Sequence, residues 1–396
     1  MLLNIDLEKL IRLRHWLHAH PEVSRHEHKT AKAVLKFLNE NARPDEIVPL
    51  DGTGFAAVYA GATAGKTVMI RCELDALPIH EINDDIPYRS LYDGVAHKCG
   101  HDGHMTILAG LAQQLVERPA MGRVVLLFQP DEETGTGASQ CCAHKNFEKI
   151  RPDLAFALHN LPGYPAGEIV CKAGTFASEV RYVAIEFSGK EAHSAQPETG
   201  VSPALALAEL TLKAQAIQAL HDRTEAYALV VPVYSQMGVQ ASGVYPANGE
   251  LHFTLRSADA AVLETMWQEL SDCARSIAKL HGLDVEFEIK EHFAASVNSQ
   301  LGFDMIKQVS AQLGYSFTTI DHAFRWGEDF GEITKDYSGA MFGLGSGLSK
   351  PALHNPDYDF PDEILGCGIQ MFTALIKLAL KQESAGEQPT AVPDDV

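Results

Sequence analysis

Side chains that can bind divalent metal ions gather in a few short segments of this 396-residue chain. One loop, at 99–104, holds a cysteine and two histidines, and acids and single histidines stand in other segments. The candidate ligands and their neighbours are Asp75, Cys99, His101, Glu132, Glu133, His159 and His354. Cysteine, histidine and carboxylate are the ligands that zinc and similar divalent ions take in proteins. Each segment alone is weak evidence, because a histidine after a strand is more often a hydrogen-bonded loop residue than a ligand.

The elements that would position these candidates are short apolar runs typical of buried strands. Four such runs, at 67–72, 123–128, 154–158 and 338–345, each precede one or more of the candidates. Ligands of open α/β sheets bind beyond the carboxyl ends of the strands. We therefore expect the candidates to meet at one edge of one sheet and to form a metal site there.

The number of candidates favours two ions over one. A structural zinc ion takes four protein ligands and a catalytic one takes three, fewer than this edge offers. Two ions would use the surplus, polarise a carbonyl and generate hydroxide near neutral pH. Glu132 and Glu133 leave a predicted strand, and neighbours on an extended strand point to opposite sides. One of the two could then bind metal while the other stays free as general base.

The order of predicted elements indicates an α/β fold with an insertion. Strands and helices alternate through the first half, which predicts a mixed, mostly parallel sheet flanked by helices. From residue 176 the order is β-α-β-β-α-β, the ferredoxin-like α+β arrangement, and the chain then resumes helix, strand and helix. We expect a discontinuous metal-binding domain of residues 1–175 and 296–382, an inserted domain of residues 176–295, and a flexible tail of residues 383–396.

Composition favours small-molecule chemistry inside the cell. The formal net charge of −20 would repel nucleic acid and anionic membranes, so neither is an expected partner. No apolar run approaches the roughly 20 residues of a membrane span, and the N-terminus predicts an amphipathic helix capped by Asp6. That helix does not resemble a secretory signal. The seven cysteines are an odd, scattered set that does not suggest disulfides, so a cytoplasmic location is expected.

Seven strings of the sequence resemble, in order, the blocks of peptidase family M20, in its aminoacylase and hippurate-hydrolase-like branch. They are RCELDALPI, HKCGHDGHMTILAG, FQPDEETGTGA, ALHNLP, GKEAHSAQP, GEDFG and LHNPDYDF. The resemblance implies two divalent ions, of zinc, manganese, cobalt or nickel, with Cys99 shared between them. His101, Glu133, His159 and His354 would complete the ligand set. Glu132 would be the general base acting on metal-activated water, and Asp75 would support the site, while Asp102 and His104 would be either packing residues or residues that support the ligands.

The resemblance also implies that the inserted domain is a lid and dimerisation domain. His193, in GKEAHSAQP, would stabilise the oxyanion, and in related enzymes this histidine comes from the neighbouring subunit. A homodimer through the lid is therefore expected. Arg256, closing a predicted strand of the lid, is our candidate for a substrate carboxylate, since a guanidinium pairs with a carboxylate bidentately. The alternative for Arg256 is a plain surface arginine.

The expected function is hydrolysis of N-acyl amino acids, of the aminoacylase or hippurate hydrolase type. Departures near the lid histidine, at Glu198 and Ser202, and at Gly243 where relatives often carry asparagine, leave the substrate open. Two alternatives remain. A dipeptidase or aminobenzoyl-glutamate amidase would use the same core, and a catalytically silent metal-binding homologue would have no use for a free Glu132.

Overall fold

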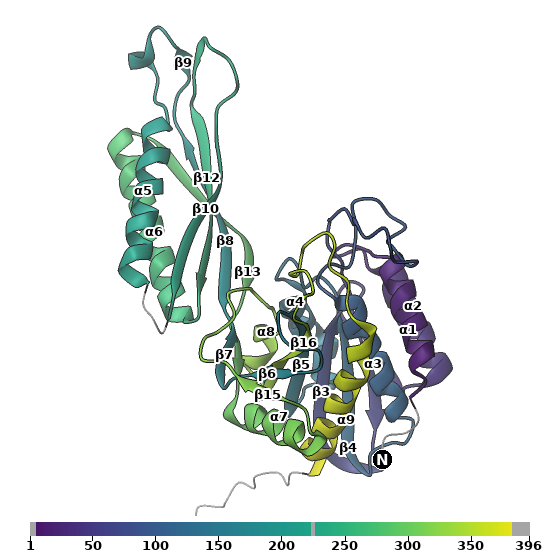
Figure 1. Ribbon diagram of the computed structural model, residues 1–396. Helices are drawn as coiled ribbons and strands as arrows, with labels where there is room; N and C mark the ends of the chain where they lie inside the picture. Colours follow the sequence, from purple (N-terminus) through teal and green to yellow (C-terminus); the bar gives the residue numbers. More distant parts are fainter. Residues whose placement is uncertain (1–4, 223–225, 382–396) are drawn as a thin grey trace, which may run out of the picture.

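The computed structural model describes residues 5–222 and 226–381, and the predicted tail at 383–396 lies outside them. Two parts of the chain have separate hydrophobic cores. Figure 1 shows a sheet layered between helices and a narrower arm that extends away from it.

The larger part is built on an eight-stranded sheet. Its strands in spatial order are β1 (Glu46–Pro49), β2 (Phe55–Ala60), β4 (Met121–Gln129), β3 (Thr63–Glu73), β5 (Leu154–Pro162), β16 (Gly339–Gly347), β6 (Ile169–Cys171) and β15 (Phe317–Thr319). The four central strands, β4, β3, β5 and β16, are mutually parallel, and antiparallel pairs stand toward the edges. The predicted α/β fold with a mixed, mostly parallel sheet is confirmed.

Helices cover both faces of this sheet because its strands bury side chains on both. On β3, Val68 and Ile70 belong to one core, whereas Met69 between them belongs to the other, the alternation that a strand imposes. The first face carries α1 (Leu7–Ala19), α2 (His28–Asn41), α3 (His101–Gln114), α7 (Gln300–Leu313) and α9 (Leu365–Lys381). The second carries α4 (Gly137–Ala143), η1 (Lys145–Lys149) and α8 (Gly331–Thr334). As predicted, Asp6 caps α1 by accepting a hydrogen bond from the Lys9 amide at 3.0 Å.

The stretch from η3 (Asp362–Ile364) through α9 corrects one expectation. Residues Asp362–Lys381 are long and apolar enough to span a membrane, by length and composition alone, although no such run was expected. The stretch is mostly buried inside the protein, with Phe372 and Leu375 fully enclosed in the larger core. An apolar helix enclosed in this way is a core helix, so it is weak evidence for a membrane.

The arm has the predicted ferredoxin-like strand order. Its antiparallel sheet runs β10 (Ala228–Met237), β12 (Asn248–Ser257), β8 (Glu179–Ser188), β13 (Asp284–Phe293). The helices α5 (Ala204–His221) and α6 (Ala260–His281) cover one face, and we call the other the open face. At the far end β9 (Ala192–His193) pairs with β11 (Val244–Tyr245), beside η2 (Pro197–Thr199). Where the arm joins the larger part, β7 (Gly174–Ala177) pairs with β14 (Ser296–Asn298).

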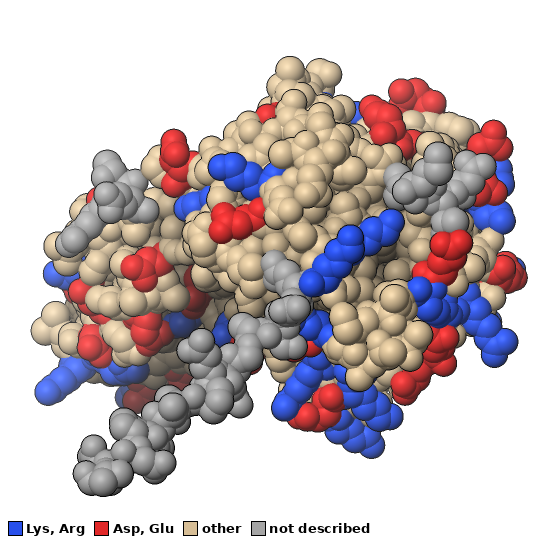
Figure 2. All heavy atoms as spheres, turned by 90° about the horizontal axis from the view of Figure 1, so that it is seen from below, with Lys and Arg blue, Asp and Glu red and all other residues tan. Residues whose placement is uncertain are grey.

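Acidic residues exceed basic ones, 52 against 32 in the whole sequence. On the face drawn in Figure 2, both signs are nevertheless interspersed among uncharged side chains. Several acidic residues are instead buried at the carboxyl ends of the central strands, among them Asp75, Glu132 and Glu328.

Candidate metal centre

The predicted ligands come from the ends of the central strands and from the start of α3. Glu133 follows β4, His159 lies near the end of β5, and His354 stands in the turn after β16. Cys99 and His101 flank Gly100. This glycine is the N-cap residue of α3, and its φ of 96° lies in the left-handed region. A Cβ at Gly100 would meet Oδ1 of Asn160 at 2.5 Å, so only glycine lets this loop approach the end of β5 so closely.

All five predicted metal ligands lie together. Sγ of Cys99 is 3.4 Å from Nε2 of His159, and Nε2 of His354 is 3.7 Å from Oε2 of Glu133. Nε2 of His101 is 3.8 Å from Oε1 of Glu133. The ligand atoms of Cys99, His101 and His159 lie within 4.8 Å of one another, and so do those of Cys99, Glu133 and His354. Cys99 belongs to both groups, which is the arrangement that a shared ligand requires.

Two of these atoms lack a hydrogen-bond partner in the part of the chain that the structure describes. Nε2 of His101 and Oε1 of Glu133 are buried without a hydrogen bond, although buried polar atoms are normally satisfied. The other ring nitrogen of His101 is 2.9 Å from the Asp75 carbonyl, and that of His159 is 2.9 Å from the Asn160 carbonyl. Each ring therefore donates from Nδ1 and leaves Nε2 to bind a cation, so the residues fit a metal centre.

Negative charge is in excess around this cluster. Burial, together with Glu328 and Glu133, raises the pKa of Glu132 well above its usual value. Burial likewise raises the pKa of Glu133, to about 7. The nearby Arg71 guanidinium is engaged elsewhere, pairing with Glu73, with Glu328 at 2.9 Å and with Asp329. Divalent ions would supply the missing positive charge.

The imidazoles and the thiol respond to the same surroundings. Burial lowers the pKa of His159 to about 3 and also lowers that of His354, so both rings are neutral, as metal ligands must be. Burial opposes protonation of His101, but Asp75 and neighbouring acids raise its pKa to about 10. Burial and Glu133 raise the pKa of the Cys99 thiol, so a thiolate at this position needs a cation beside it.

The expectation that Glu132 and Glu133 point to opposite sides of a strand is wrong. β4 ends at Gln129, and Asp131 has a φ of 58°, so both glutamates lie in a turn. Both carboxylates face His101, since Oε2 of Glu132 also lies 3.8 Å from its Nε2. The Glu132 carboxylate accepts no hydrogen bond from the described residues, and one of its oxygens lies within 4.8 Å of ligand atoms of His101 and Glu133.

Asp75 is buried behind the ligands. Its Oδ2 accepts hydrogen bonds from Ser24 Oγ at 2.8 Å and from the Glu133 amide at 2.9 Å. Its backbone carbonyl accepts from His101, so one residue orients two of the predicted ligands. This is the supporting position that the resemblance implies.

A hollow of about 580 Å³ opens between the cluster and the open face of the arm. We call it the main hollow. Cys99, Glu132, Glu133, His159 and His354 line one side. The side opposite is lined by Val180, Tyr182, Thr254, Arg256, Glu291 and Phe293. Arg256 thus lines the main hollow on the side opposite the cluster, and it donates a hydrogen bond to the Arg325 carbonyl at 2.8 Å.

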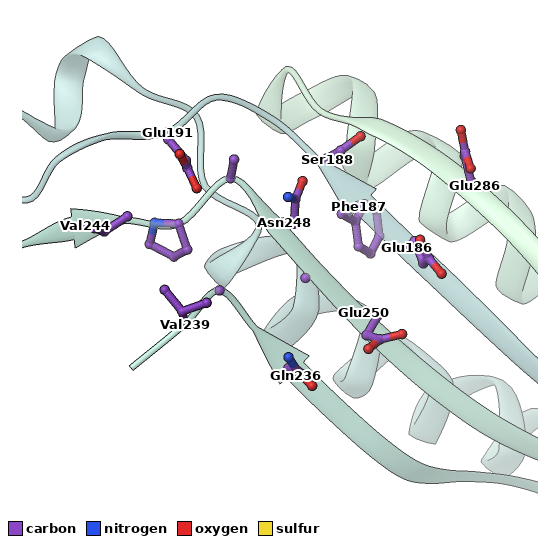
Figure 3. A pocket seen from close by; sticks show the side chains of 14 residues that line it. Glu186, Phe187, Ser188, Glu191, Gln236, Val239, Val244, Asn248, Glu250 and Glu286 are labelled. Atoms are coloured by element: carbon purple, nitrogen blue, oxygen red, sulfur yellow. The ribbon is translucent and has the colours of Figure 1, made fainter. Parts of the chain in front are cut away.

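His193 is the one predicted site residue that the described chain does not bring to the cluster. It is exposed on β9, at the far end of the arm in Figure 1, and it does not line the main hollow. A second hollow of about 490 Å³ lies toward this end (Figure 3). Acids such as Glu186, Glu250 and Glu286 line it, without histidine or cysteine, so it offers no comparable metal site.

The sequence reasoning left several buried partners without roles. They are Arg71, Glu73, Glu328 and Asp329, and Glu73 adjoins His104, which was expected to pack or support the site. The two ring nitrogens of His104 hydrogen-bond to the Glu73 carboxylate, at 2.6 Å, and to the side-chain oxygen of Asn160. The Asp329 carboxylate accepts a hydrogen bond from the Gln129 side-chain amide at 2.8 Å. The strings RCELDALPI and GEDFG contained all four, but buried acids cannot be told from solvated ones by residue type.

Comparisons with known proteins agree with this geometry. The model of "Peptidase family M20/M25/M40" matches residues 69–378. An N-acetyldiaminopimelate deacetylase of Exiguobacterium sibiricum is 31% identical over 359 residues, covering 90% of this chain and 95% of the relative. An N-acetylcysteine deacetylase of Bacillus subtilis is 28% identical, covering 94% and 97%.

A solved structure has the same architecture. The Bacillus subtilis YxeP protein, described as a dinuclear metal-binding peptidase of the M20 family, superposes with a TM-score of 0.81 at 27% identity. The match covers 95% of this chain and 99% of that one. The chain therefore belongs to peptidase family M20/M25/M40 and is a metal-dependent amidohydrolase.

Proposed function

We propose that the protein hydrolyses the amide bond of N-acyl amino acids. The observation that carries the proposal is the pair of buried, unpartnered atoms, Nε2 of His101 and Oε1 of Glu133, beside the Cys99 thiol and the free carboxylate of Glu132. The deacetylase names of the two relatives support an N-acyl amino acid as substrate. Neither name supports an aromatic acyl group of the hippurate type.

Five residues would hold two divalent ions, with Cys99 shared between them: Cys99, His101, Glu133, His159 and His354. Such ions, when bound, polarise a carbonyl and make water acidic enough to supply hydroxide near neutral pH. Asp75 would keep His101 and Glu133 in place through the bonds described above. We expect zinc, manganese, cobalt or nickel, since histidine and thiolate ligands suit these ions.

Glu132 would act as the general base. Its carboxylate has no hydrogen bond from the described residues, and burial among Glu328 and Glu133 raises its pKa, which makes it a better proton acceptor than an exposed glutamate. It would take a proton from the attacking water and later deliver it to the leaving amine.

The main hollow divides into a charged side and an apolar side. Arg256 would pair with the substrate carboxylate. Phe324 and Trp326 stack with ring centroids 5.1 Å apart, and Trp326 lies 5.2 Å from the His159 ring. We propose that this aromatic surface receives the acyl group.

We propose that the arm, residues 176–295, is the lid domain and that it joins two subunits, with residues 1–175 and 296–382 as the catalytic domain. Three exposed leucines on α5, Leu205, Leu212 and Leu220, form an apolar stripe next to the unpaired edge of β10. A second copy would cover both. His193 would then reach the partner's cluster and stabilise the oxyanion. The seven free cysteines accord with a cytoplasmic location.

Chelation tests the metal dependence. Purified protein should hydrolyse N-acetyl amino acids, lose that activity on chelation and removal of metal, and regain it with zinc, manganese, cobalt or nickel. Activity that chelation leaves unchanged would contradict the proposal. On the same panel, faster cleavage of dipeptides or of aminobenzoyl-glutamate would identify the alternative substrates, and bound metal without turnover would identify a silent homologue.

Subunit mixing tests the role of His193. The Glu132→Gln and His193→Ala variants should each be inactive alone. If His193 acts on the partner's cluster, mixed dimers contain one intact site and recover activity. No recovery in verified mixed dimers would contradict action between subunits.

A further inference from the structure

The wall of the main hollow opposite the metal cluster is formed by three strands of the arm. In the sheet register Arg256 of β12 and Phe293 of β13 both pair with Val180 of β8. One step along, Thr254 and Glu291 both pair with Tyr182. These six residues all line the hollow. The register therefore presents two rows of side chains to the cluster: one row runs Arg256, Val180, Phe293, and the other runs Thr254, Tyr182, Glu291. Each row has a charged residue at one end.

The two charged residues are Arg256 and Glu291, and they stand on opposite sides of β8. Two strand spacings separate their backbones by roughly 10 Å. No ion pair within 4 Å joins them, and in the part of the chain that the structure describes the Glu291 carboxylate has no hydrogen bond. Burial raises the pKa of Glu291, and the charge of Arg256 only partly opposes this effect. Each is partly enclosed. A bulge in β13 between Ile289 and Glu291 turns the carboxylate into this face.

An unpaired carboxylate in a substrate hollow is costly unless a ligand satisfies it. A partly enclosed acid loses water when substrate binds, and a neutral side chain placed against it supplies nothing in return. A cationic side chain would restore the lost interaction. The aromatic surface of Phe324 and Trp326 lies with the cluster and suits the acyl group, which leaves Glu291 to face the amino acid portion.

We propose that Glu291 selects N-acyl amino acids whose side chain ends in an ammonium or guanidinium group, with Arg256 holding the α-carboxylate of the same molecule. The proposal rests on the N-acyl amino acid hydrolysis proposed above and names its substrate class. The separation of Arg256 and Glu291 suits a side chain that carries its charge several bonds from the α-carbon, as ornithine and lysine do.

Matched substrates test this selection in the metal-loaded enzyme. N-acetyl-lysine and N-acetyl-ornithine should exceed the neutral isostere N-acetyl-norleucine in kcat/KM by about tenfold or more, because a site built for a polar group rejects an analogue that lacks it. The difference should lie mainly in KM, since Glu291 is on the wall opposite the cluster. N-acetyl-glutamate should be the poorest substrate of the four.

Variants at position 291 separate recognition from structure. Glu291→Gln should abolish the preference for cationic substrates, so that N-acetyl-lysine and N-acetyl-norleucine are hydrolysed with similar kcat/KM. Glu291→Lys should reverse the preference and favour N-acetyl-glutamate. Glu286→Gln is the matched control, because Glu286 lies on the same strand but lines the second hollow, and it should leave the preference unchanged.

Two results would overturn the inference alone. One is hydrolysis of all four substrates without a preference for the cationic pair. The other is an equal loss on all four in Glu291→Gln, which would mean that Glu291 only positions its neighbours. If the metal-loaded wild type cleaves no N-acyl amino acid, the proposed function fails together with the inference.

Discussion

Two buried clusters of histidine and acidic residues adjoin the segment 97–104, and they differ in how their charge is balanced. One is the metal centre, where Arg71 pairs with Glu73, Glu328 and Asp329 and the further acids Asp75, Glu132 and Glu133 stand beside the predicted ligands. The other, which we call the α1 network, consists of Arg14, His18, Glu81, Lys98, Asp102, Asp359 and Asp362. There three cationic groups meet four acids.

The α1 network is paired internally. His18 bridges Asp102 at 2.9 Å and Glu81 at 3.0 Å, while Lys98 reaches Glu81 at 2.6 Å. Arg14 pairs with Asp102 at 3.3 Å. Both clusters contain buried atoms without a hydrogen bond, Asp102 Oδ1 in the α1 network among them, so the difference lies in the charges. The charges of the α1 network nearly balance and tie α1 to α3, whereas the excess of acids in the metal centre suits bound cations. Charge balance therefore distinguishes a structural cluster from a functional one where composition does not.

The largest expected effect separates two adjacent acids of the metal centre. Glu132→Gln should lower kcat by a factor of about 10² to 10⁴, because general acid-base catalysis is worth that much, while bound metal stays at the wild-type level. Glu133→Gln should lower bound metal as well, because it removes a predicted ligand. Elemental analysis and steady-state kinetics on both variants measure the difference.

Glu117→Gln, on the exposed surface, is the control for a general effect of removing one acid. If Glu132→Gln lost its metal, or if its turnover fell less than about tenfold, Glu132 would not be the base.

The metal centre was largely predictable from the sequence, and the α1 network was not. Parallel strands bring their carboxyl ends to one edge, so residues that follow them, such as Glu133 and His159, meet by topology alone. Arg14 and Asp359 are far apart in the chain, and nothing in their spacing indicates that they meet. The roles of Glu328 and Asp329 were not predicted for the same reason, because nothing in the sequence indicates that they meet Arg71. The string GEDFG, which contains them, was recognised only as part of the family resemblance.

Local backbone geometry sets the remaining limits. The opposite orientation expected for Glu132 and Glu133 failed because the strand ends before them and Asp131 turns the chain. The position of His193 follows from how the arm extends, which strand patterns do not encode. Glu291 enters the main hollow through a bulge, and an alternating pattern gives no sign of where a bulge falls.

The next effect should appear in stability and not in chemistry. Asp102→Asn leaves Arg14 and His18 without their shared anion, and breaking a buried ion pair costs about 3–5 kcal/mol. We expect a melting temperature several degrees lower. Metal content and kcat of the folded protein should change little. A variant with unchanged melting but depleted metal would move Asp102 from the α1 network into the metal centre.

The smallest expected effect is the pH dependence of the α1 network. Burial opposes protonation of His18, but Asp102 and Glu81 raise its pKa from 6.5 to about 9. The folded state therefore keeps a proton that the unfolded state releases. The resulting stabilisation is complete below pH 6.5 and disappears as the pH rises through about 9, amounting to at most about 3 kcal/mol.

Thermal melts of the metal-loaded protein between pH 6 and 10 would measure this loss. His101 also has a raised pKa, but as one of the proposed metal ligands it would bind an ion in place of a proton in the metal-loaded protein, so we expect the dependence to come from His18. His18→Gln removes the titrating group and should flatten the pH dependence of the melting temperature relative to wild type, whatever its effect on absolute stability. An unchanged dependence in His18→Gln would show that His18 is neutral in the folded protein, and the three cations of the α1 network would then be two.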